Sequence, residues 1–325
     1  MSFALAPLRR ALAGRDRVAR VVVAAARGST PREVGAAMLV WEDGQDGTIG
    51  GGALEHEAAA RARQALAQGD GPLLQAVPLG PALGQCCGGA VTLLTEIFTE
   101  IDLQSIEKET VFARPCTADR PPSLALNRLL AQAREGCGPV APALIDGWMV
   151  EPVAPPPAPL WIYGAGHVGR ALVDVITPLP DFVITWVDTS PDRFPQPPEG
   201  VTILPAAQPQ RAVAHAPRDA HHLILTYSHA LDLELCHALL THGFASAGLI
   251  GSASKWARFQ SRLGALGHDR ASIDRITCPI GDKTLGKHPQ AIAIGVAGAL
   301  IRMKNTNRET DHDRNPRKHA RASHA

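Results

Sequence analysis

The clearest hydrophobic pattern lies in the second half of the chain, where short apolar runs alternate with helical repeats. Four segments each contain an apolar run typical of a buried strand: "LWIYGAGHVGRALVDVI", "DFVITWVDTS", "HHLILTYS" and "ASAGLIGS". Helical repeats over about 231–242 and 254–266 separate or follow these runs. Because strands that alternate with helices form a parallel sheet covered by helices, we predict an α/β domain of the Rossmann-like, doubly wound type.

The first half has a more mixed pattern, which favours an α+β domain. A helix-like segment at about 2–13 precedes the β-branched run in "RVARVVVAAARG". The stretch "AAMLVWEDGQDGTIGGGALEHEAAARARQALAQG" then predicts strand, turn, strand, glycine loop and helix, with the helix ending near Gly69. The remaining predicted elements are a strand at about 90–98, a helix near 123–135 and a hairpin at Asp146-Gly147.

A proline-rich segment separates these two halves. "EPVAPPPAPL", residues 151–160, has five prolines in ten residues and is typical of an extended, semi-rigid linker. We therefore predict an N-terminal domain over 1–150 and a Rossmann-like domain over 161–303. From about Lys304 the chain is polar and nearly free of apolar anchors, so we expect residues 304–325 to form a disordered tail.

Composition and charge argue against several classes of partner. The chain has 325 residues, 45% of them apolar and 19% charged, which is typical of a folded soluble protein. With 32 basic and 31 acidic residues, its net charge of +1 predicts no nucleic-acid partner and no anionic membrane partner. The apolar run at 291–301 is too short to span a bilayer, and the N-terminus lacks the pattern of a secretory signal. We expect a cytoplasmic protein whose six cysteines are reduced.

The motif "GAGHVG" fits a dinucleotide-binding turn between a strand and a helix. Gly164 would allow the tight turn, Gly166 would let a pyrophosphate approach the backbone, and Gly169 would let the helix pack on the strand. Asp188 ends the next predicted strand, where an acid commonly binds a ribose hydroxyl. His167, inside the turn, either faces solvent without a role or faces a ligand cleft.

A second glycine loop, "TIGGGALEHE", places Gly50, Gly51 and Gly52 directly before a helix. Free amides and the helix dipole at such a position suit an anion such as a phosphate. The alternative is a tight strand-to-helix turn without a ligand. We favour the anion site, because three glycines lose more backbone entropy than a simple turn requires.

Arg32 lies in the loop "RGSTPREVGAAMLV" together with Ser29 and Thr30. These polar side chains could hold an anionic ligand, with the guanidinium of Arg32 as a fork. From spacing alone, a surface turn with an ordinary salt bridge explains these residues better than a ligand site does.

Two adjacent cysteines, Cys86 and Cys87, form the least expected motif, "GQCCGG". A vicinal disulfide would be strained, and buried structural cysteine is the commonest fate of a single cysteine. Core packing does not explain the glycines around them, which remove side chains where another group must come near. Thiolates suit a soft metal centre or a transferable sulfur atom, so we interpret Cys86 and Cys87 as cofactor or metal ligands.

Taken together, "GSTPREVGAAMLV", "TIGGGALEHEA", "GQCCGG", "IYGAGHVGRAL" and "GLIGSASKWARF…CPIG" resemble the XdhC/CoxI family over nearly the whole chain. The resemblance implies an N-terminal XdhC/CoxI domain and a C-terminal Rossmann domain. It also implies a maturation factor for molybdenum hydroxylases that binds the molybdenum cofactor, a pterin dithiolene carrying a phosphate. Such a chaperone would hold the cofactor, in its molybdopterin form, while a cysteine desulfurase supplies the terminal sulfido ligand. It would then deliver the cofactor to apo-xanthine dehydrogenase, an enzyme of purine metabolism.

Under this resemblance, Cys86 or Cys87 is the thiol nearest molybdenum, and the loop 50–52 lies near the cofactor phosphate. The Rossmann turn would hold part of the same cofactor or a separate nucleotide. The expected partners are the molybdenum subunit of xanthine dehydrogenase and the cysteine desulfurase, and a homodimer is the default oligomer.

An alternative function is a NAD(P)-dependent oxidoreductase in which the two adjacent cysteines form a redox-active dithiol. The cofactor carrier would have no turnover of its own, whereas the oxidoreductase would. Lys255 and Arg258 share one face of a predicted helix at i, i+3, where they could neutralise a phosphate or dock a partner. We interpret that face as a solvated helix surface.

Overall fold

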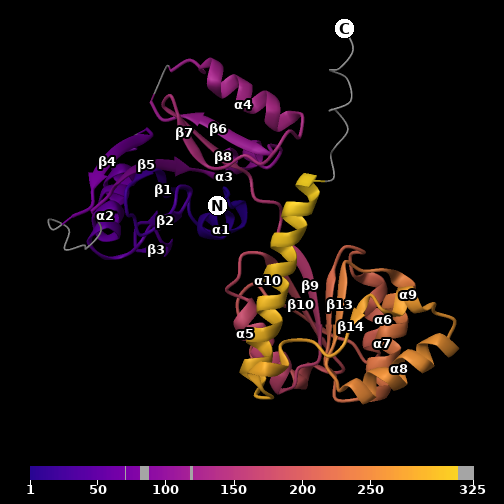
Figure 1. Cartoon of the computed structure of the whole chain (residues 1–325). Helices are drawn as coiled ribbons and strands as arrows, with labels where there is room; N and C mark the ends of the chain where they lie inside the picture. The colour runs from indigo at the N-terminus through magenta and orange to yellow at the C-terminus, as the bar shows by residue number, and fades with distance from the viewer. Residues whose placement is uncertain (70, 81–87, 118–119, 314–325) are drawn as a thin grey trace, which may run out of the picture. The chain divides into compact units, whose positions relative to one another are not determined.

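The structure is a computed structural model that describes residues 1–69, 71–80, 88–117 and 120–313, the last nine of these by backbone alone. The chain forms two compact units, Met1–Pro156 and Pro157–Asp311, and each has its own hydrophobic cores (Figure 1). The division falls inside the proline-rich segment.

An antiparallel five-stranded sheet forms the centre of unit 1, with strand order β3-β2-β1-β5-β4. Its central strand alternates, so that Ala19, Val21 and Val23 face one side of the sheet while Val18 and Val22 face the other. The strand bounds are β1 Val18–Arg27, β2 Ala37–Trp41, β3 Gly44–Gly47, β4 Leu73–Pro78 and β5 Ala90–Phe98.

The two faces of this sheet are covered by different elements. Helix α2 places a stripe of small and apolar side chains, including Leu54, Ala58 and Ala62, against one face. Helices α1 and α3 and a three-stranded sheet, β6-β8-β7, supply the apolar side chains that pack on the other face. The remaining bounds in unit 1 are α1 Leu5–Leu12, α2 Gly52–Gln68, α3 Glu100–Ile106, β6 Val111–Pro115, α4 Leu124–Arg134, β7 Ala143–Ile145 and β8 Trp148–Pro152. The predicted hairpin at Asp146-Gly147 connects β7 and β8.

A buried ion-pair network joins the two sheets of unit 1. Glu151 of β8 is fully buried and accepts from Arg20 of β1 and Arg114 of β6, each at 2.7 Å. Arg114 also contacts Glu96 of β5 at 2.6 Å. The two guanidinium groups hold the pKa of the Glu151 carboxyl below its usual value against the opposing effect of burial, so the network is two cations neutralised by two anions.

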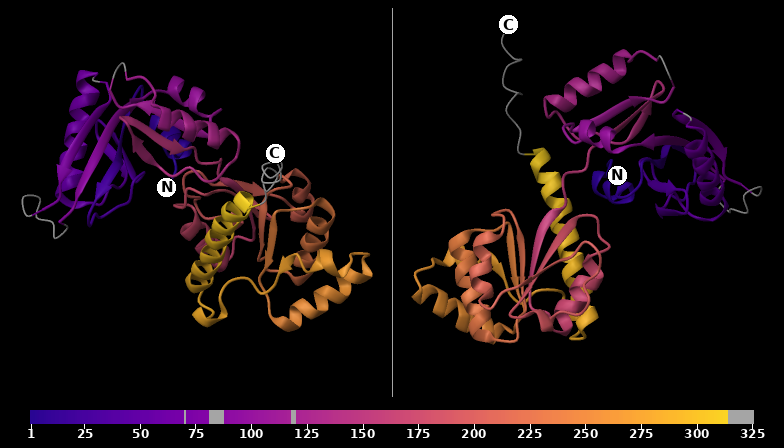
Figure 2. Two further views of the ribbon diagram at one scale, coloured as in Figure 1. Left: turned by 45° about the horizontal axis from the view of Figure 1, so that its top comes forward. Right: turned by 180° about the vertical axis from the view of Figure 1, so that it is seen from behind.

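Unit 2 is built on a parallel six-stranded sheet of order β11-β10-β9-β12-β13-β14, the doubly wound arrangement that the sequence predicts. Helices α5 and α10 lie on one face, and α6 to α9 lie on the other (Figures 1 and 2). The strands are β9 Ala158–Tyr163, β10 Phe182–Asp188, β11 Thr202–Pro205, β12 His221–Ile224, β13 Ser246–Leu249 and β14 Ile276–Thr277. The helices are α5 His167–Ile176, α6 Pro209–Ala212, α7 His229–His242, α8 Ala253–Ala265, α9 Arg270–Ile273 and α10 Pro289–Asp313.

Helix α10 contains the apolar run at 291–301 and continues beyond it. Ala293, Val296 and Leu300 pack into the core beneath the sheet, which explains the run without a membrane. The expectation of a disordered tail from Lys304 is wrong at its start, because the helix extends to Asp313 and the Lys304 ammonium contacts Asp181 at 2.5 Å. Within the residues that the structure describes, no helix combines the length and apolar character that crossing a membrane requires.

Candidate functional site

Three glycine-rich segments of unit 1, far apart in sequence, meet at one end of the five-stranded sheet. The last residue pair between β1 and β5 is Arg27 with Ala90, so Gly28 and Gly89 lie next to each other immediately beyond it. A Cβ atom on Gly89 would lie 2.4 Å from the carbonyl oxygens of both Arg27 and Ser29. Gly89 is therefore required because the chain itself passes here, and a ligand is not needed to explain it.

The loop Gly50–Gly52 also lies against the 27–32 segment, as Gly89 does. A Cβ atom on Gly50 would lie 2.5 Å from Cγ of Pro31, so the 27–32 segment lies between the two glycine loops. All three glycines have positive φ, 125°, 75° and 65°, a region that residues with side chains rarely adopt. The backbone of this turn therefore needs each glycine, whether or not an anion binds. Gly51 and Gly88 differ from Gly50 and Gly89, because a Cβ on either would meet no atom of the described residues within 4 Å.

Glu55, in the first turn of α2, already occupies donors of the predicted anion loop. Its Oε2 accepts from the Gly51 amide at 3.0 Å, the Ile49 amide at 3.2 Å and the Thr48 hydroxyl at 2.6 Å. The carboxylate sits at the positive end of the helix dipole, which stabilises it there. A phosphate at this loop would have to replace Glu55 or use the amides further into the helix.

Arg32 stands beside this loop with its side chain about one third exposed and 3.5 Å from the carboxylate of its neighbour Glu33. The Thr30 hydroxyl donates to the Arg32 carbonyl and so shapes the loop that carries the guanidinium. Cys86 and Cys87 lie outside the described residues. In the described part of the chain, no three His, Cys, Asp or Glu side chains group as a metal ion would need.

The Rossmann turn of unit 2 has a distinct physical reason for each of its glycines. A Cβ on Gly164 would lie 2.4 Å from the Leu225 carbonyl oxygen, and one on Gly169 would lie 1.9 Å from the Gly164 carbonyl oxygen. Gly166 is exposed, and a Cβ there would meet nothing within 4 Å. The first and third glycines thus serve strand and helix packing, and the second leaves open space at the start of α5.

Asp188 ends β10 as predicted, but its carboxylate is buried and engaged within the protein. Oδ2 accepts from the Ala165 amide at 2.6 Å, inside the glycine turn, and Oδ1 accepts from the Thr189 amide at 2.6 Å. The Arg193 guanidinium lies 3.3 Å from Oδ1 and also covers the ring of Tyr227. A ribose hydroxyl would therefore have to compete with Arg193 for Asp188. His167 is exposed at the first position of α5.

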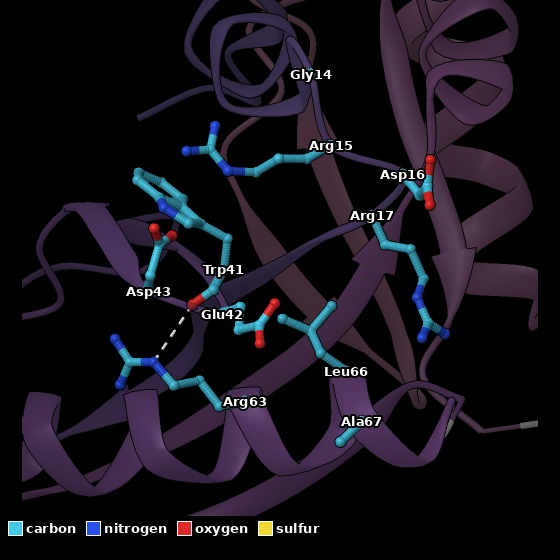
Figure 3. Close-up of a pocket in the computed structure, with 10 residues that line it drawn as sticks. All are labelled: Gly14, Arg15, Asp16, Arg17, Trp41, Glu42, Asp43, Arg63, Leu66 and Ala67. Atoms are coloured by element: carbon cyan, nitrogen blue, oxygen red, sulfur yellow. Dashed lines mark hydrogen bonds between the residues drawn. The ribbon is translucent and has the colours of Figure 1, made fainter.

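Figure 3 shows a separate pocket of unit 1, with a volume of about 790 Å³. The order of the strands and helices places it at the opposite end of the five-stranded sheet from the three glycine segments. It is lined by the residues before β1 and by the end of α2, whereas the glycine segments follow β1 and precede α2. Arg15 lies over the Trp41 ring at 4.6 Å, and Arg63 donates to the Trp41 carbonyl. Acidic side chains of Asp16, Glu42 and Asp43 stand among these arginines, so the pocket has no dominant charge. Sequence patterns gave no signal for it.

The helix face with Lys255 and Arg258 differs from the solvated surface that we predicted. Lys255 is only 9% exposed, and its Nζ lies 2.5 Å from Asp232 Oδ2 and 2.9 Å from the Ile250 carbonyl oxygen. Asp232 is fully buried and also accepts from the Thr226 hydroxyl at 2.7 Å. The interpretation as a solvated surface is therefore wrong for Lys255, which is buried against Asp232 of another helix, α7. It is correct for Arg258, which is exposed.

The fold and these sites define a two-domain protein in which an N-terminal α+β unit precedes a Rossmann unit. A family model described as the XdhC Rossmann domain matches residues 160–300, and one described as the XdhC and CoxI family matches residues 11–76. The two matches together cover more than half of the chain in the expected order. The chain belongs to the XdhC and CoxI family, as the sequence motifs predict.

Two individual proteins show the extent of the likeness. The uncharacterized protein YqeB of Escherichia coli (strain K12) is 26% identical over 288 residues, which are 86% of this chain. The match covers 42% of YqeB, so the chain spans less than half the length of this curated relative. A crystal structure from Bacillus halodurans, described as a xanthine dehydrogenase, has a TM-score of 0.69 at 20% identity, covering 99% of this chain and 98% of that one. These two chains share a fold.

Proposed function

We propose that this protein is a chaperone that binds the molybdenum cofactor, holds it for sulfuration by a cysteine desulfurase and delivers it to apo-xanthine dehydrogenase. The observation that carries the proposal is the meeting of the segments 27–32, 50–52 and 88–89 at one end of the unit 1 sheet. Family membership supports the same reading. The cofactor is cargo here, so the protein needs a site that binds and then releases it.

The bare backbone at this end of the sheet suits a bulky cargo. At Gly51 and Gly88, no described residue occupies the space where a side chain would lie, and both glycines belong to segments that reach the 27–32 loop. Cys86 and Cys87 immediately precede Gly88 in sequence and are the soft thiol ligands that the proposal assigns to molybdenum. A thiolate ligand can be exchanged, which a carrier requires.

The phosphate of the cargo would use the cationic and amide donors of the same region. Arg32 supplies a guanidinium that is partly exposed and pairs with the adjacent, exposed Glu33. At the Gly50–Gly52 loop, the phosphate would take the place of Glu55, which is itself an anion held by those amides. The exchange of one anion for another would make phosphate binding weak enough to reverse.

The Rossmann unit would hold a nucleotide, either appended to the cargo or separate from it. Its open Gly166 at the start of α5 supports a ligand at this turn. In this proposal, the partners are the molybdenum subunit of xanthine dehydrogenase and the desulfurase, the protein acts in the cytoplasm as part of purine metabolism, and a homodimer is its default assembly.

The test is to purify the full chain from cells that make molybdenum cofactor, beside Cys86→Ala and Cys87→Ala. Cys137→Ala is the matched control, because Cys137 is an exposed thiol of the same unit. We expect pterin and molybdenum on the wild type and on the control, with loss from at least one of the two adjacent variants. Retention of cofactor by both variants would contradict a thiol ligand at this motif.

A chain that carries NAD instead of pterin, and oxidises or reduces a substrate, would support the oxidoreductase with a redox dithiol. The glycine turn of the Rossmann unit is the structural feature that favours this second candidate. The spectrum of bound material distinguishes the two, because a pterin and a nicotinamide absorb and fluoresce differently.

A further inference from the structure

Unit 2 has a hollow of about 270 Å³ at the carboxyl edge of its parallel sheet. It lies where α7 and α8 begin, after β12 and β13 respectively, and its lining includes His229, Ser252, Ser254 and Arg258. Ligands of doubly wound sheets bind outside the carboxyl ends of the strands, near the point where strand order reverses. In this sheet the reversal lies between β9 and β12, so β12 borders both the glycine turn and the hollow.

The described residues that line the hollow include cationic side chains and no acidic one. Arg258 and Arg262 are exposed one turn apart on α8, and His229 is exposed at the first position of α7. In the described part of the chain, none of these three side chains makes a hydrogen bond or ion pair with the protein. Like charges at i, i+4 slightly destabilise a helix. Arg258 and Arg262 therefore destabilise α8 unless an anion neutralises them.

The buried pair of Lys255 and Asp232 fixes the geometry of the hollow. Lys255 is on α8 and Asp232 is on α7, so their 2.5 Å contact ties the first turns of the two helices together. Nζ also donates to the Ile250 carbonyl at the end of β13. Because Asp232 neutralises Lys255, the free positive charge of the hollow belongs to the two arginines.

Hydroxyl and amide donors complete the lining. Ser252 caps α8, with its hydroxyl accepting from the Lys255 amide, and the exposed Ser254 follows two residues later. The first amides of both helices point out of their N-termini without intrahelical partners. Two guanidinium groups, hydroxyl groups and helix N-termini are the donors that phosphate oxygens prefer.

From this combination of a hollow, unpaired arginines and fixed helix N-termini, we propose that the Rossmann unit has a phosphate-binding site formed by Arg258, Arg262 and His229. Its ligand is a diphosphate or the phosphate of a nucleotide, and the site is separate from the cargo site proposed in unit 1. The arginine-rich lining suits an anionic group such as a phosphate.

The proposal is tested by isothermal titration of the full chain with inorganic diphosphate and, separately, with AMP. The test variant is Arg258→Gln/Arg262→Gln, and Arg258→Lys/Arg262→Lys keeps the charge while removing the fork. The matched control is Arg270→Gln, since Arg270 is an exposed arginine of the same unit outside the hollow. All variants change exposed side chains, and thermal unfolding of each checks that it folds.

We expect saturable binding to the wild type and the control, and at least tenfold weaker binding to the double glutamine variant. The affinity of the double lysine variant should lie between those of the wild type and the double glutamine variant, because lysine keeps the charge but cannot bind phosphate in a bidentate manner. If the wild type binds AMP more tightly than diphosphate, and the double glutamine variant loses this binding, the ligand is a nucleotide. If the two affinities are equal, the site recognises the phosphate group alone. Absence of saturable binding to the wild type, or equal affinity of the double glutamine variant, would overturn the site. Neither titration requires molybdenum cofactor, so the outcome of this test is independent of the cargo proposal.

Discussion

Lys255 Nζ lies 2.5 Å from Asp232 Oδ2, and both side chains are buried between α7, α8 and the end of β13. Removing one member of a buried pair leaves an uncompensated charge, which typically costs about 3–5 kcal/mol of unfolding free energy. We therefore expect Asp232→Ala to destabilise unit 2 by roughly that amount. Urea unfolding followed by circular dichroism measures it.

The control for this prediction is Asp274→Ala, which removes an exposed i, i+4 partner of Arg270 and should cost less than about 1 kcal/mol. The double variant Asp232→Leu/Lys255→Met should recover part of the loss, because no unpaired charge remains. Equal stability of Asp232→Ala and Asp274→Ala would show that the buried pair has no structural role.

Glu55 competes with any anion at the Gly50–Gly52 loop, so Glu55→Gln should strengthen phosphate binding there. The variant removes a negative charge while keeping a group that can accept from the Gly51 amide. It should also lower stability by about 0.5–1 kcal/mol through the lost charge at the helix N-terminus. Phosphorus NMR titration with inorganic phosphate measures the affinity.

Glu57→Gln is the matched control, since Glu57 lies on the same helix in an exposed pair with Arg61. A stronger affinity in Glu55→Gln alone is the expected result. Unchanged affinity in both variants would mean that the loop amides do not receive phosphate, and the role of the three glycines would then be the turn itself.

Because His222 is buried, we expect the free energy of unfolding to decrease in mild acid. The ring is 1% exposed in the core of unit 2, its Nδ1 pairs with the Tyr163 hydroxyl at 3.2 Å, and burial lowers its pKa to about 3. The unfolded chain binds a proton near pH 6.5 while the folded chain does not, so stability falls as pH decreases from about 6.5 toward 3. One such group gives a slope of up to about 1.4 kcal/mol per pH unit.

Unfolding free energies between pH 6.5 and 5 measure this slope, in a range above most carboxyl titrations. His222→Phe should flatten the profile, whereas His288→Phe, at an exposed position, should leave it unchanged. An equally steep profile in His222→Phe would assign the acid sensitivity to other groups.

The Rossmann turn offers a matched pair of glycine substitutions. A Cβ at position 169 would lie 1.9 Å from the Gly164 carbonyl oxygen, so Gly169→Ala should separate α5 from β9 and cost about 1–3 kcal/mol. Gly166→Ala adds its methyl group to open space and should change stability by less than about 0.5 kcal/mol. Thermal unfolding of both variants tests the difference, and a larger loss in Gly166→Ala would contradict the assigned roles.

Local sequence patterns predicted most elements of this protein. The apolar runs that became β9, β10, β12 and β13 are recognisable because strands buried on both faces need continuous apolar side chains. The glycines at 164, 166 and 169 are recognisable because their spacing reflects a strand, a turn and a helix that are adjacent in the chain. Helix α2 and the Asp146-Gly147 hairpin follow for the same reason, since their signals lie within a few residues of each other.

Only the tertiary structure decided what the candidate site residues do. Position 89 must be glycine because the backbone of Arg27–Ser29, at least sixty positions away in sequence, passes next to it, and a ligand is not needed to explain it. Lys255 is buried because Asp232, on another helix, neutralises it, and α10 continues past Lys304 with its lysine anchored on Asp181. Sequence by itself determines local conformation and the apolar pattern. Burial, charge pairing and occupied hydrogen-bond donors depend on groups that only folding brings together, so their assignment requires the three-dimensional structure.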